Sequence, residues 1–374
     1  METLRFCEAH LEHTVHTIET LVRLESPSTD KAAVDRCGAA LSGLLREAGA
    51  AVERLPQRER GDHIRARFDG TGEPILILGH FDTVWPTGTL ERMPVRRDGD
   101  RLFGPGTFDM KAGIAIALAA VDALRATQTA HVPIVMLWTT DEEIGSETSR
   151  AAIEEEARKC RAVYVLEPAL PGGALKTARK GCGEFEVVVH GAAAHAGLDP
   201  GKGASAIHEL AAQIAAIERL QDLPNGISVN VGLVSGGTRA NVVAEMARAV
   251  VDARAPTRAA AERVEAAMRS LQPVNPRTRL RVSGGFERPP MERSPASREL
   301  FARARAVASI LGRDLGEGSA GGGSDGNFTA AAGVPTLDGL GAVGDGAHAA
   351  HEHVELSSLP WRSALLAGLL AQTR

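Results

Sequence analysis

The chain has 374 residues, which is long for one hydrophobic core and favours two domains. Its hydrophobic content of 44% and charged content of 24% are typical of a soluble globular protein. The net charge of −5 argues against a nucleic-acid-binding protein, and the absence of a long apolar run argues against a membrane-spanning one.

The N-terminal segment METLRFCEAHLEHTVHTIE has the pattern of one amphipathic helix. It lacks a basic start followed by an apolar core, so a secretory signal is not expected. The cysteines have no CxxC spacing, and we expect reduced, buried thiols in a cytoplasmic protein. A cysteine ligand or nucleophile is the open alternative at these four positions: Cys7, Cys37, Cys160 and Cys182.

Helices and strands alternate up to about residue 175. Most of the strands are wholly apolar, and this favours a mainly parallel sheet that is covered on both faces. The predicted elements are a helix at Ala32–Ala48, strands at His63–Phe68 and Ile75–Leu78, a helix at Gly113–Leu124, a strand at Ile134–Trp138, a helix at Ser146–Glu156 and a strand at Ala162–Leu166.

After Lys180 the strands mix charged and apolar positions, as half-exposed strands do. Their order with the helices, strand–helix–strand–strand–helix–strand, is that of a split ferredoxin-like sandwich. The predicted elements are Glu184–His190, Ala204–Glu218, Ile227–Val234, Ala244–Asp252, Thr257–Leu271 and Thr278–Ser283. The chain then returns to helix–strand character and ends in a predicted helix at Leu359–Gln372.

The change from wholly apolar strands to strands of mixed polarity, and back again, predicts an inserted domain. We expect one domain from residues 1–179 and 286–374, and a second, α+β domain from residues 180–285. The insertion would let candidate ligands near residue 348 join those before residue 170 at one site. Glycine-dense stretches at 321–323 and 339–346 are expected to let the backbone approach a ligand closely, with flexible surface loops as the plainer alternative.

Seven acidic and imidazole residues lie in five segments, most of them directly after a short apolar run. The end of a buried strand is where a rigid scaffold can aim a ligand into a cleft. The residues are His80 and Asp82 in GHFDT, Asp109 in GPGTFDMK, Glu142 and Glu143 in TTDEEIGS, Glu167 in VLEP, and His348 in GDGAHAAHEH.

Each segment alone also has a plainer interpretation. His80 and Asp82 could be a strand-end pair in solvent, Asp109 a helix N-cap, the two glutamates an acidic helix start, and Glu167 a solvated acid. Together they supply two imidazoles and several carboxylates, a donor set suited to zinc or a similar divalent ion. One carboxylate could bridge two ions, which would activate water and polarise a carbonyl while a free carboxylate moves the proton.

The motifs GHFDT, GPGTFDMK, TTDEEIGS, LEP, AAAHAG, GGGSDG and GAHAAHE together resemble those of the dinuclear-zinc aminoacylase/carboxypeptidase family. The resemblance covers nearly the whole chain, and the C-terminal motifs are most similar to those of the glutamate carboxypeptidase branch. It implies a zinc-exopeptidase-like catalytic domain with an inserted ferredoxin-like dimerisation (lid) domain. It also implies two Zn²⁺ per subunit, with Co²⁺ or Mn²⁺ as alternatives.

The resemblance assigns roles to individual residues of this chain. Asp109 would bridge the two metals and be followed by a cis peptide bond to Met110. Glu142 would be the general base, passing a proton from the attacking water to the leaving nitrogen, and Asp82 would orient His80. The remaining metal ligands would be His80 and Glu167 at one ion, and Glu143 and His348 at the other. A swap of His348 for His351 is an open alternative.

The resemblance also implies substrate contacts in the inserted domain and near its end. His195 would stabilise the tetrahedral oxyanion, commonly at the partner subunit's site. Asn241, Arg254 and Arg288 match positions that contact a substrate carboxylate, a task that suits the guanidinium fork of arginine. For Arg254, a strand-end surface charge is the plainer alternative.

The leading hypothesis is a zinc-dependent amidohydrolase that releases a C-terminal amino acid, glutamate, from an N-acyl or peptidyl substrate. The alternatives are a deacylase of the N-acetyl-amino-acid or acetylornithine type, a dipeptidase, and a non-catalytic binding protein that has lost its metals. An open strand edge in the inserted domain would favour a homodimer. Partners other than a second copy and a small-molecule substrate, such as nucleic acid or a membrane, are not expected.

Overall fold

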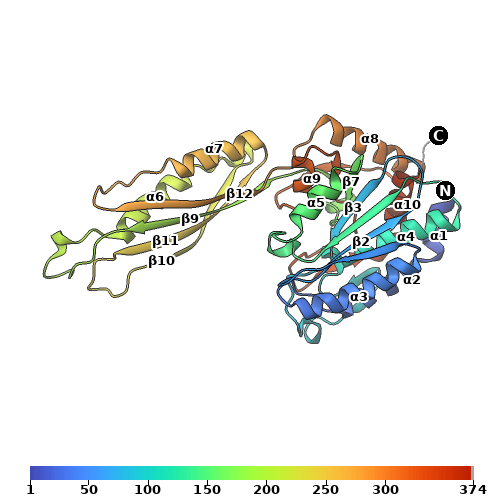
Figure 1. The fold of residues 1–374 in the computed structure, drawn as a ribbon, viewed down its shortest axis with the longest axis horizontal. Coiled ribbons are helices and arrows are strands. Elements are labelled where there is room, and N and C mark those ends of the chain that lie inside the picture. The colour runs from blue at the N-terminus through green and yellow to red at the C-terminus, as the bar shows by residue number, and fades with distance from the viewer. Residues whose placement is uncertain (372–374) are drawn as a thin grey trace. The chain divides into compact units, whose positions relative to one another are not determined.

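Figure 1 shows the computed structural model, which describes residues 1–371. The chain forms two compact units. The first comprises Met1–Thr177, Arg293–Ala320 and the segment from Ser324 to the end of the described chain. The second comprises Ala178–Glu292 with Gly321–Gly323, where the sequence predicts an insert of residues 180–285. Segments from both ends of the chain therefore build the first unit.

A six-stranded sheet forms the centre of the first unit, in the order β1-β2-β6-β3-β7-β14. The strands β6, β3, β7 and β14 are parallel neighbours, whereas β1 and β2 add an antiparallel edge. This confirms the predicted mainly parallel sheet. The strands are β1 Ala51–Leu55, β2 His63–Phe68, β3 Ile75–His80, β6 Ile134–Thr139, β7 Ala162–Val165 and β14 Thr336–Leu337.

Helices cover both faces of this sheet because its central strands are apolar on both faces. Ile75 and Ile77 of β3 belong to the larger core, with α2, α3, α4 and α10, whereas Leu76 and Leu78 pack with α5 and α9. The helices of the first unit are α1 Glu2–Ala9, α2 Leu11–Arg23, α3 Lys31–Glu47, α4 Ala112–Ala126, α5 Arg150–Ala157, α8 Pro295–Ile310, α9 Gly326–Ala331 and α10 Leu359–Leu370. Among residues 1–371, no helix has the length and hydropathy that a membrane crossing requires.

Short strands add two small sheets. One has the order β15-β16-β5-β4, and the other pairs β13 with β8. The first matters for the site because β16 follows the His348 segment and pairs with β5, which precedes the Asp109 segment. The strands are β4 Arg96–Asp98, β5 Arg101–Phe103, β8 Leu175–Arg179, β13 Glu317–Ala320, β15 Gly344–Asp345 and β16 His353–Glu355.

The second unit is a four-stranded antiparallel sheet in the order β10-β11-β9-β12, with α6 and α7 against the sheet face that carries Phe185, Val187 and Val189. This is the predicted ferredoxin-like arrangement. Ser205 and Thr257 start the two helices by accepting hydrogen bonds from backbone N–H groups three residues later. The elements are β9 Gly181–His190, α6 Ala206–Glu218, β10 Ser228–Gly236, β11 Met246–Ala255, α7 Arg258–Arg269 and β12 Arg279–Arg288.

Three predicted helices differ from those observed. The prediction of a single N-terminal helix is wrong. The segment forms two helices, α1 and α2, which are separated at His10, and the His10 ring stacks on Phe6. The helix predicted from Ser146 begins only at Arg150, because Ser146 has a left-handed backbone, with φ of 59°. The last helix ends at Leu370, and the predicted end at Gln372 lies outside the described residues.

Candidate metal centre

One edge of the central sheet brings several predicted ligands together. His80 is the last residue of β3, Glu143 follows β6, and Glu167 follows β7. These three strands are parallel neighbours, so their carboxyl ends lie at the same edge. Segments well separated in the sequence therefore deliver acidic and imidazole side chains to one place.

Asp109 reaches the same place from a turn before α4. Thr107–Lys111 forms a π-type turn in which the backbone of Asp109 is not helical. The expected cis peptide bond between Asp109 and Met110 is present. Gly106, with φ of 74°, precedes the turn, and a Cβ atom there would lie 2.6 Å from the Thr83 methyl group. A larger residue would not fit this entry to the turn.

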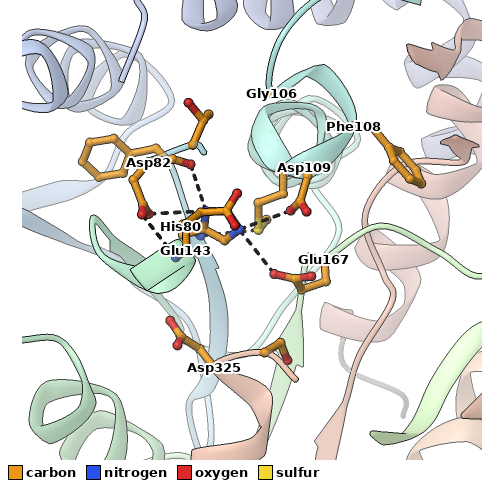
Figure 2. Close-up of polar contacts among 12 residues, drawn as sticks. His80, Asp82, Gly106, Phe108, Asp109, Glu143, Glu167 and Asp325 are labelled. Atoms are coloured by element: carbon orange, nitrogen blue, oxygen red, sulfur yellow. Dashed lines mark hydrogen bonds and ion pairs between the residues drawn. The ribbon is translucent and has the colours of Figure 1, made fainter. Parts of the chain in front are cut away.

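Asp109 lies between the two histidines. Its Oδ1 is 3.3 Å from His80 Nε2, and its Oδ2 is 3.3 Å from His348 Nε2. Glu167 Oε1 lies 3.4 Å from His80 Nε2, and Glu143 Oε2 lies 3.1 Å from His348 Nε2. Figure 2 shows the side chains of Asp109, Glu143 and Glu167 gathered around the His80 ring. Each oxygen of Asp109 thus faces a different histidine.

These separations suit metal coordination better than hydrogen bonding. Two ligands at zinc–ligand distances of about 2.0–2.1 Å and a tetrahedral angle lie about 3.3 Å apart. Among residues 1–371, His80 Nε2, Asp109 Oδ1 and Glu143 Oε1 are buried and have no partner with hydrogen-bond geometry. Buried polar atoms without partners are costly, and a shared cation would satisfy all three. The donor set therefore fits a divalent metal.

The charges of the cluster perturb one another strongly. Hydrogen bonding to Asp109 and Glu143 raises the pKa of His348 to about 10. Burial raises the pKa of Glu143 to about 7, opposed by its contact with His348. Burial works against the charge of His80, yet Asp109, Asp82 and Glu167 together raise its pKa well above the usual value. The acids create a site of negative potential that favours cations, whether protons or a metal.

His80 is oriented by Asp82, though not mainly through the carboxylate. The Nδ1 atom of His80 lies 3.0 Å from the backbone carbonyl oxygen of Asp82 and 3.4 Å from the carboxylate Oδ1. A hydrogen bond from Nδ1–H to this carbonyl leaves the Nε2 lone pair directed toward Asp109 and Glu167. The other carboxylate oxygen, Oδ2, accepts hydrogen bonds from Ser28 Oγ at 2.6 Å and from the Glu143 N–H at 3.3 Å.

Glu142 and Glu143 occupy a 3₁₀ turn, Glu142–Ile144. The two side chains join different groups. Glu143 offers an oxygen close to His80 and Asp109, whereas Glu142 offers one close to His80 and Glu167, each group lying within 4.8 Å. Adjacent residues in a 3₁₀ turn point about a third of a turn apart, which explains the divergence.

The C-terminal histidines are also distinguished. His348, with φ of 62°, has a left-handed backbone that is uncommon outside glycine. This conformation places its ring beside Asp109 and Glu143. His351 instead lies 3.9 Å from Asp345, and its side chain is exposed. The geometry favours His348 over His351 as the ligand.

Two buried acids contact the ligand-bearing segments, and the sequence analysis gives neither a role. Asp325 accepts hydrogen bonds from Thr139 Oγ1 at 3.0 Å and from Ser146 Oγ at 2.5 Å, so it braces both ends of the Glu142–Glu143 turn. Glu352 binds backbone N–H groups of the Asp109 segment. Both acids lie in or beside a glycine-rich stretch, which is the one sign of them in the sequence. Their hydrogen-bond partners are too far away along the chain to be predicted from it.

His195 and Asn241 lie side by side in the second unit. The Ala196 N–H donates to the Asn241 carbonyl at 2.9 Å, and both side chains belong to exposed residues. The Nδ1 atom of His195 accepts from the N–H groups of Gly197 and Leu198, each at 3.1 Å. A ring nitrogen that accepts carries no proton, so the neutral imidazole presents Nε2–H as a donor.

Arg254 and Arg288 lie on either side of Cys182 in the same sheet, because both pair with it in the strand register. Arg254 donates to both oxygens of Asp252, with its Nη2 at 2.6 Å from Oδ2, and its Nη1 lies 2.6 Å from Cys182 Sγ. Arg288 is buried. The guanidinium of Arg254 is therefore already paired with an acid of its own unit.

The chain is similar to known peptidases over most of its length. A model of peptidase family M20/M25/M40 matches residues 76–372. Over 368 residues the chain is 30% identical to carboxypeptidase G2 of Pseudomonas sp. (strain RS-16), covering 95% of this chain and 88% of that protein.

Two solved structures share the fold. Aminopeptidase PepT from Bacillus cereus superposes with a TM-score of 0.79 at 22% identity, covering 96% of this chain and 98% of that one. The Bacillus subtilis YXEP protein, a dinuclear metal-binding peptidase, gives a TM-score of 0.70 at 15% identity, covering 97% and 98%. From the family match and the identity to carboxypeptidase G2, the chain belongs to peptidase family M20/M25/M40.

Proposed function

We propose that the protein is a dinuclear metal hydrolase that releases a C-terminal amino acid, glutamate, from an N-acyl or short peptidyl substrate. The observation that carries the proposal is the position of Asp109, with one carboxylate oxygen toward His80 and the other toward His348. A carboxylate placed in this way is suited to bridge two cations. The similarity to carboxypeptidase G2 over 95% of the chain supports the type of reaction.

The ligands divide into two sets around Asp109. His80 and Glu167 would hold one ion, and His348 and Glu143 the other, with Asp109 shared. The mixture of imidazole and carboxylate suits Zn²⁺ and also accepts Co²⁺ or Mn²⁺. When bound, the ions would supply Lewis-acid activation of a water and of the scissile carbonyl.

Glu142 is the proposed general base. It offers a carboxylate oxygen close to His80 and Glu167. Its carboxylate would take a proton from the attacking water and deliver it to the leaving nitrogen. Asp82 would keep His80 in the orientation that leaves Nε2 available, through the contact with Nδ1.

His195 is the proposed donor to the oxyanion that forms at the carbonyl, in the active site of the partner subunit. Two backbone N–H groups bind its Nδ1 and support the tautomer with Nε2–H. Asn241 and Arg288 are the proposed contacts of the substrate carboxylate. Arg254 is paired with Asp252, but an arginine has five N–H donors. A donor that this pairing leaves over would let Arg254 also contact the substrate carboxylate.

A homodimer is part of the proposal. The strand β10 lies at one edge of the second unit's sheet, next to β11, and Leu233 and Val234 on it are 67% and 59% exposed. An exposed apolar edge strand favours pairing with another chain. Contact between two copies across a twofold axis would cover the same edge in both.

The proposal is tested by assaying one zinc-loaded sample with an N-aroyl-glutamate and with N-acetylornithine, beside a sample treated with a chelator. We expect chelator-sensitive hydrolysis of the glutamate compound. Preference for acetylornithine would assign a deacylase activity to the same site. Hydrolysis that persists after complete metal removal would contradict the metal-dependent mechanism.

A further inference from the structure

Glu352 is a buried acid beside the candidate metal centre, and its residue is 1% exposed. Its two carboxylate oxygens accept four hydrogen bonds. Oε1 accepts from the N–H groups of Phe108 at 2.9 Å and Asp109 at 3.0 Å. Oε2 accepts from the Gly106 N–H at 2.9 Å and from Trp85 Nε1–H at 2.8 Å. All four partners are donors, so the ionised carboxylate satisfies them without a second acceptor.

These contacts join three segments that carry candidate ligands. Glu352 comes four residues after His348, and its own backbone carbonyl accepts from the Gly104 N–H at 3.3 Å. Trp85 follows His80 and Asp82 in the segment after β3. The Phe108 and Asp109 N–H groups belong to the turn that aims the proposed bridging carboxylate. One side chain therefore fixes the backbone of Asp109 relative to the segments on either side of it.

We propose that Glu352 is a positioning residue that holds Asp109 where its two oxygens can serve both metals, an inference that rests on the proposed function. The hydrogen bond from the Asp109 N–H holds the Phe108–Asp109 peptide group. The hydrogen bond from the Phe108 N–H holds the peptide group before it. Partners of this kind orient a ligand before the metal arrives, and their loss typically lowers metal affinity about 10- to 100-fold.

Glu352→Gln tests this role with little change of shape. The amide keeps one acceptor oxygen, which can satisfy two of the four donors. Its NH₂ group would face the other two donors and repel them. The turn can escape this conflict only by moving, and Asp109 would move with it. Glu355→Gln is the matched control, because it removes the same charge three residues later in β16, where the Glu355 backbone pairs with Arg101 and Val343.

The measurement is Zn²⁺ affinity of the full-length metal-free protein by competition with a chromogenic chelator. Circular dichroism establishes that each variant is folded. We expect Glu352→Gln to weaken Zn²⁺ binding about 10- to 100-fold, and Glu355→Gln to bind as the wild type does. A role limited to folding would instead lower the melting temperature of the metal-free protein and leave the Zn²⁺ affinity of the folded fraction unchanged.

Equal Zn²⁺ affinity in folded Glu352→Gln and wild type would overturn the inference. Failure of the wild type itself to bind Zn²⁺ would contradict the proposed function, which keeps the two failures distinct. If Glu352→Gln does not fold, the Zn²⁺ affinity of Trp85→Phe provides the test. This substitution removes one hydrogen-bond donor to Glu352 Oε2, and Trp85 is a half-buried loop residue. A smaller loss of affinity in Trp85→Phe supports the positioning role, and wild-type affinity overturns it.

Discussion

Asp109 illustrates how a single side chain depends on its surroundings. The sequence suggests two roles for it, a helix N-cap or a metal ligand, and both satisfy local rules. In the structure it caps no helix, and each of its carboxylate oxygens faces a histidine. The contact with His80 and His348 also lowers the pKa of Asp109, despite a burial that would raise it. The two histidines therefore favour the anionic form of Asp109.

A first prediction concerns Glu142. We expect Glu142→Gln to lower kcat by about 10²- to 10⁴-fold, because an amide cannot accept the proton. The bound metal, measured by atomic emission on the purified variant, should be retained since Glu142 is not a proposed ligand. Glu147→Gln, an exposed acid of the same segment, is the control. Near-normal turnover by Glu142→Gln would show that another group is the base.

A second prediction concerns His195. We expect His195→Ala to lower kcat by about 10²- to 10³-fold with a smaller change in KM, because an oxyanion donor acts in the transition state. His190→Ala, at the exposed end of β9, serves as the control. Steady-state kinetics on the proposed N-aroyl-glutamate substrate make the comparison. Unchanged kcat in His195→Ala would assign the oxyanion contact elsewhere.

At the scale of elements, buried acids hold loops by accepting backbone N–H groups. Glu352 does this in the first unit, where Asp325 accepts instead from the hydroxyl groups of Thr139 and Ser146. In the second unit, Glu209 of α6 is 3% exposed and accepts from Val274 N–H at 2.9 Å, Asn275 N–H at 2.7 Å and Gln213 Nε2 at 2.7 Å. The loop between α7 and β12 is thereby attached to α6. Each of these carboxylates accepts hydrogen bonds from buried donors that have no acceptor within their own loop and that would otherwise bond to water.

The pH dependence of this attachment is a third prediction. Burial alone would raise the pKa of Glu209, but its hydrogen bonds lower it below the usual value. Its contribution to stability is thus present above the unfolded pKa of about 4.3 and is lost as pH falls through the lower, folded value. We expect Glu209→Gln to be less stable at pH 7 by about 1.5–3 kcal/mol, and the difference to shrink below pH 4.

Melting temperatures of wild type and Glu209→Gln, compared at pH 7 and below pH 4, measure this effect. The exposed Glu218 at the other end of α6 gives the control substitution, Glu218→Gln, which should change neither value. A gap between wild type and Glu209→Gln that is the same at both pH values would show that the charge of Glu209 has no part in the attachment.

At the scale of the whole molecule, the chain forms two compact units. Both arms of the interrupted first unit are needed for the candidate metal centre, because His348 comes after the insert and the other candidate ligands come before it. The second unit has a closed core of its own and an open sheet edge at β10. The edge is the feature from which self-association is expected.

A fourth prediction tests that association. We expect Leu233→Lys on β10 to shift the protein from dimer to monomer, since a lysine on an edge strand opposes strand pairing. Val274→Lys is the matched control, because Val274 is 72% exposed but lies outside the strands. Sedimentation equilibrium measures the mass of each. A wild-type protein that is monomeric throughout, or a Leu233→Lys dimer, would rule out this interface.

The sequence by itself determined four strands of the central sheet (β2, β3, β6 and β7), the four strands of the second unit, most helices and the side chains at the strand ends. It did not predict β1, β14 or the short strands of the two small sheets. His80 and Glu167 could be found because an apolar run before each is a local signal of a buried strand. The cis bond after Asp109 followed from a resemblance of motifs, whereas the inserted sandwich followed from the order of strands and helices after Lys180. The break at His10 and the 3₁₀ turn at Glu142 were not predicted, because short-range torsions there depend on packing that the pattern does not carry.

Only the tertiary structure decided which of these side chains meet. Glu352 and Asp109 are 243 residues apart, and Asp325 binds Ser146 across 179 residues. No pattern of neighbouring residues encodes such contacts, since they arise when parallel strands and the chain after the insert converge on one sheet edge. The same convergence gave Asp109 a histidine at each oxygen, because a carboxylate acquires its neighbours from the fold and not from the residues beside it.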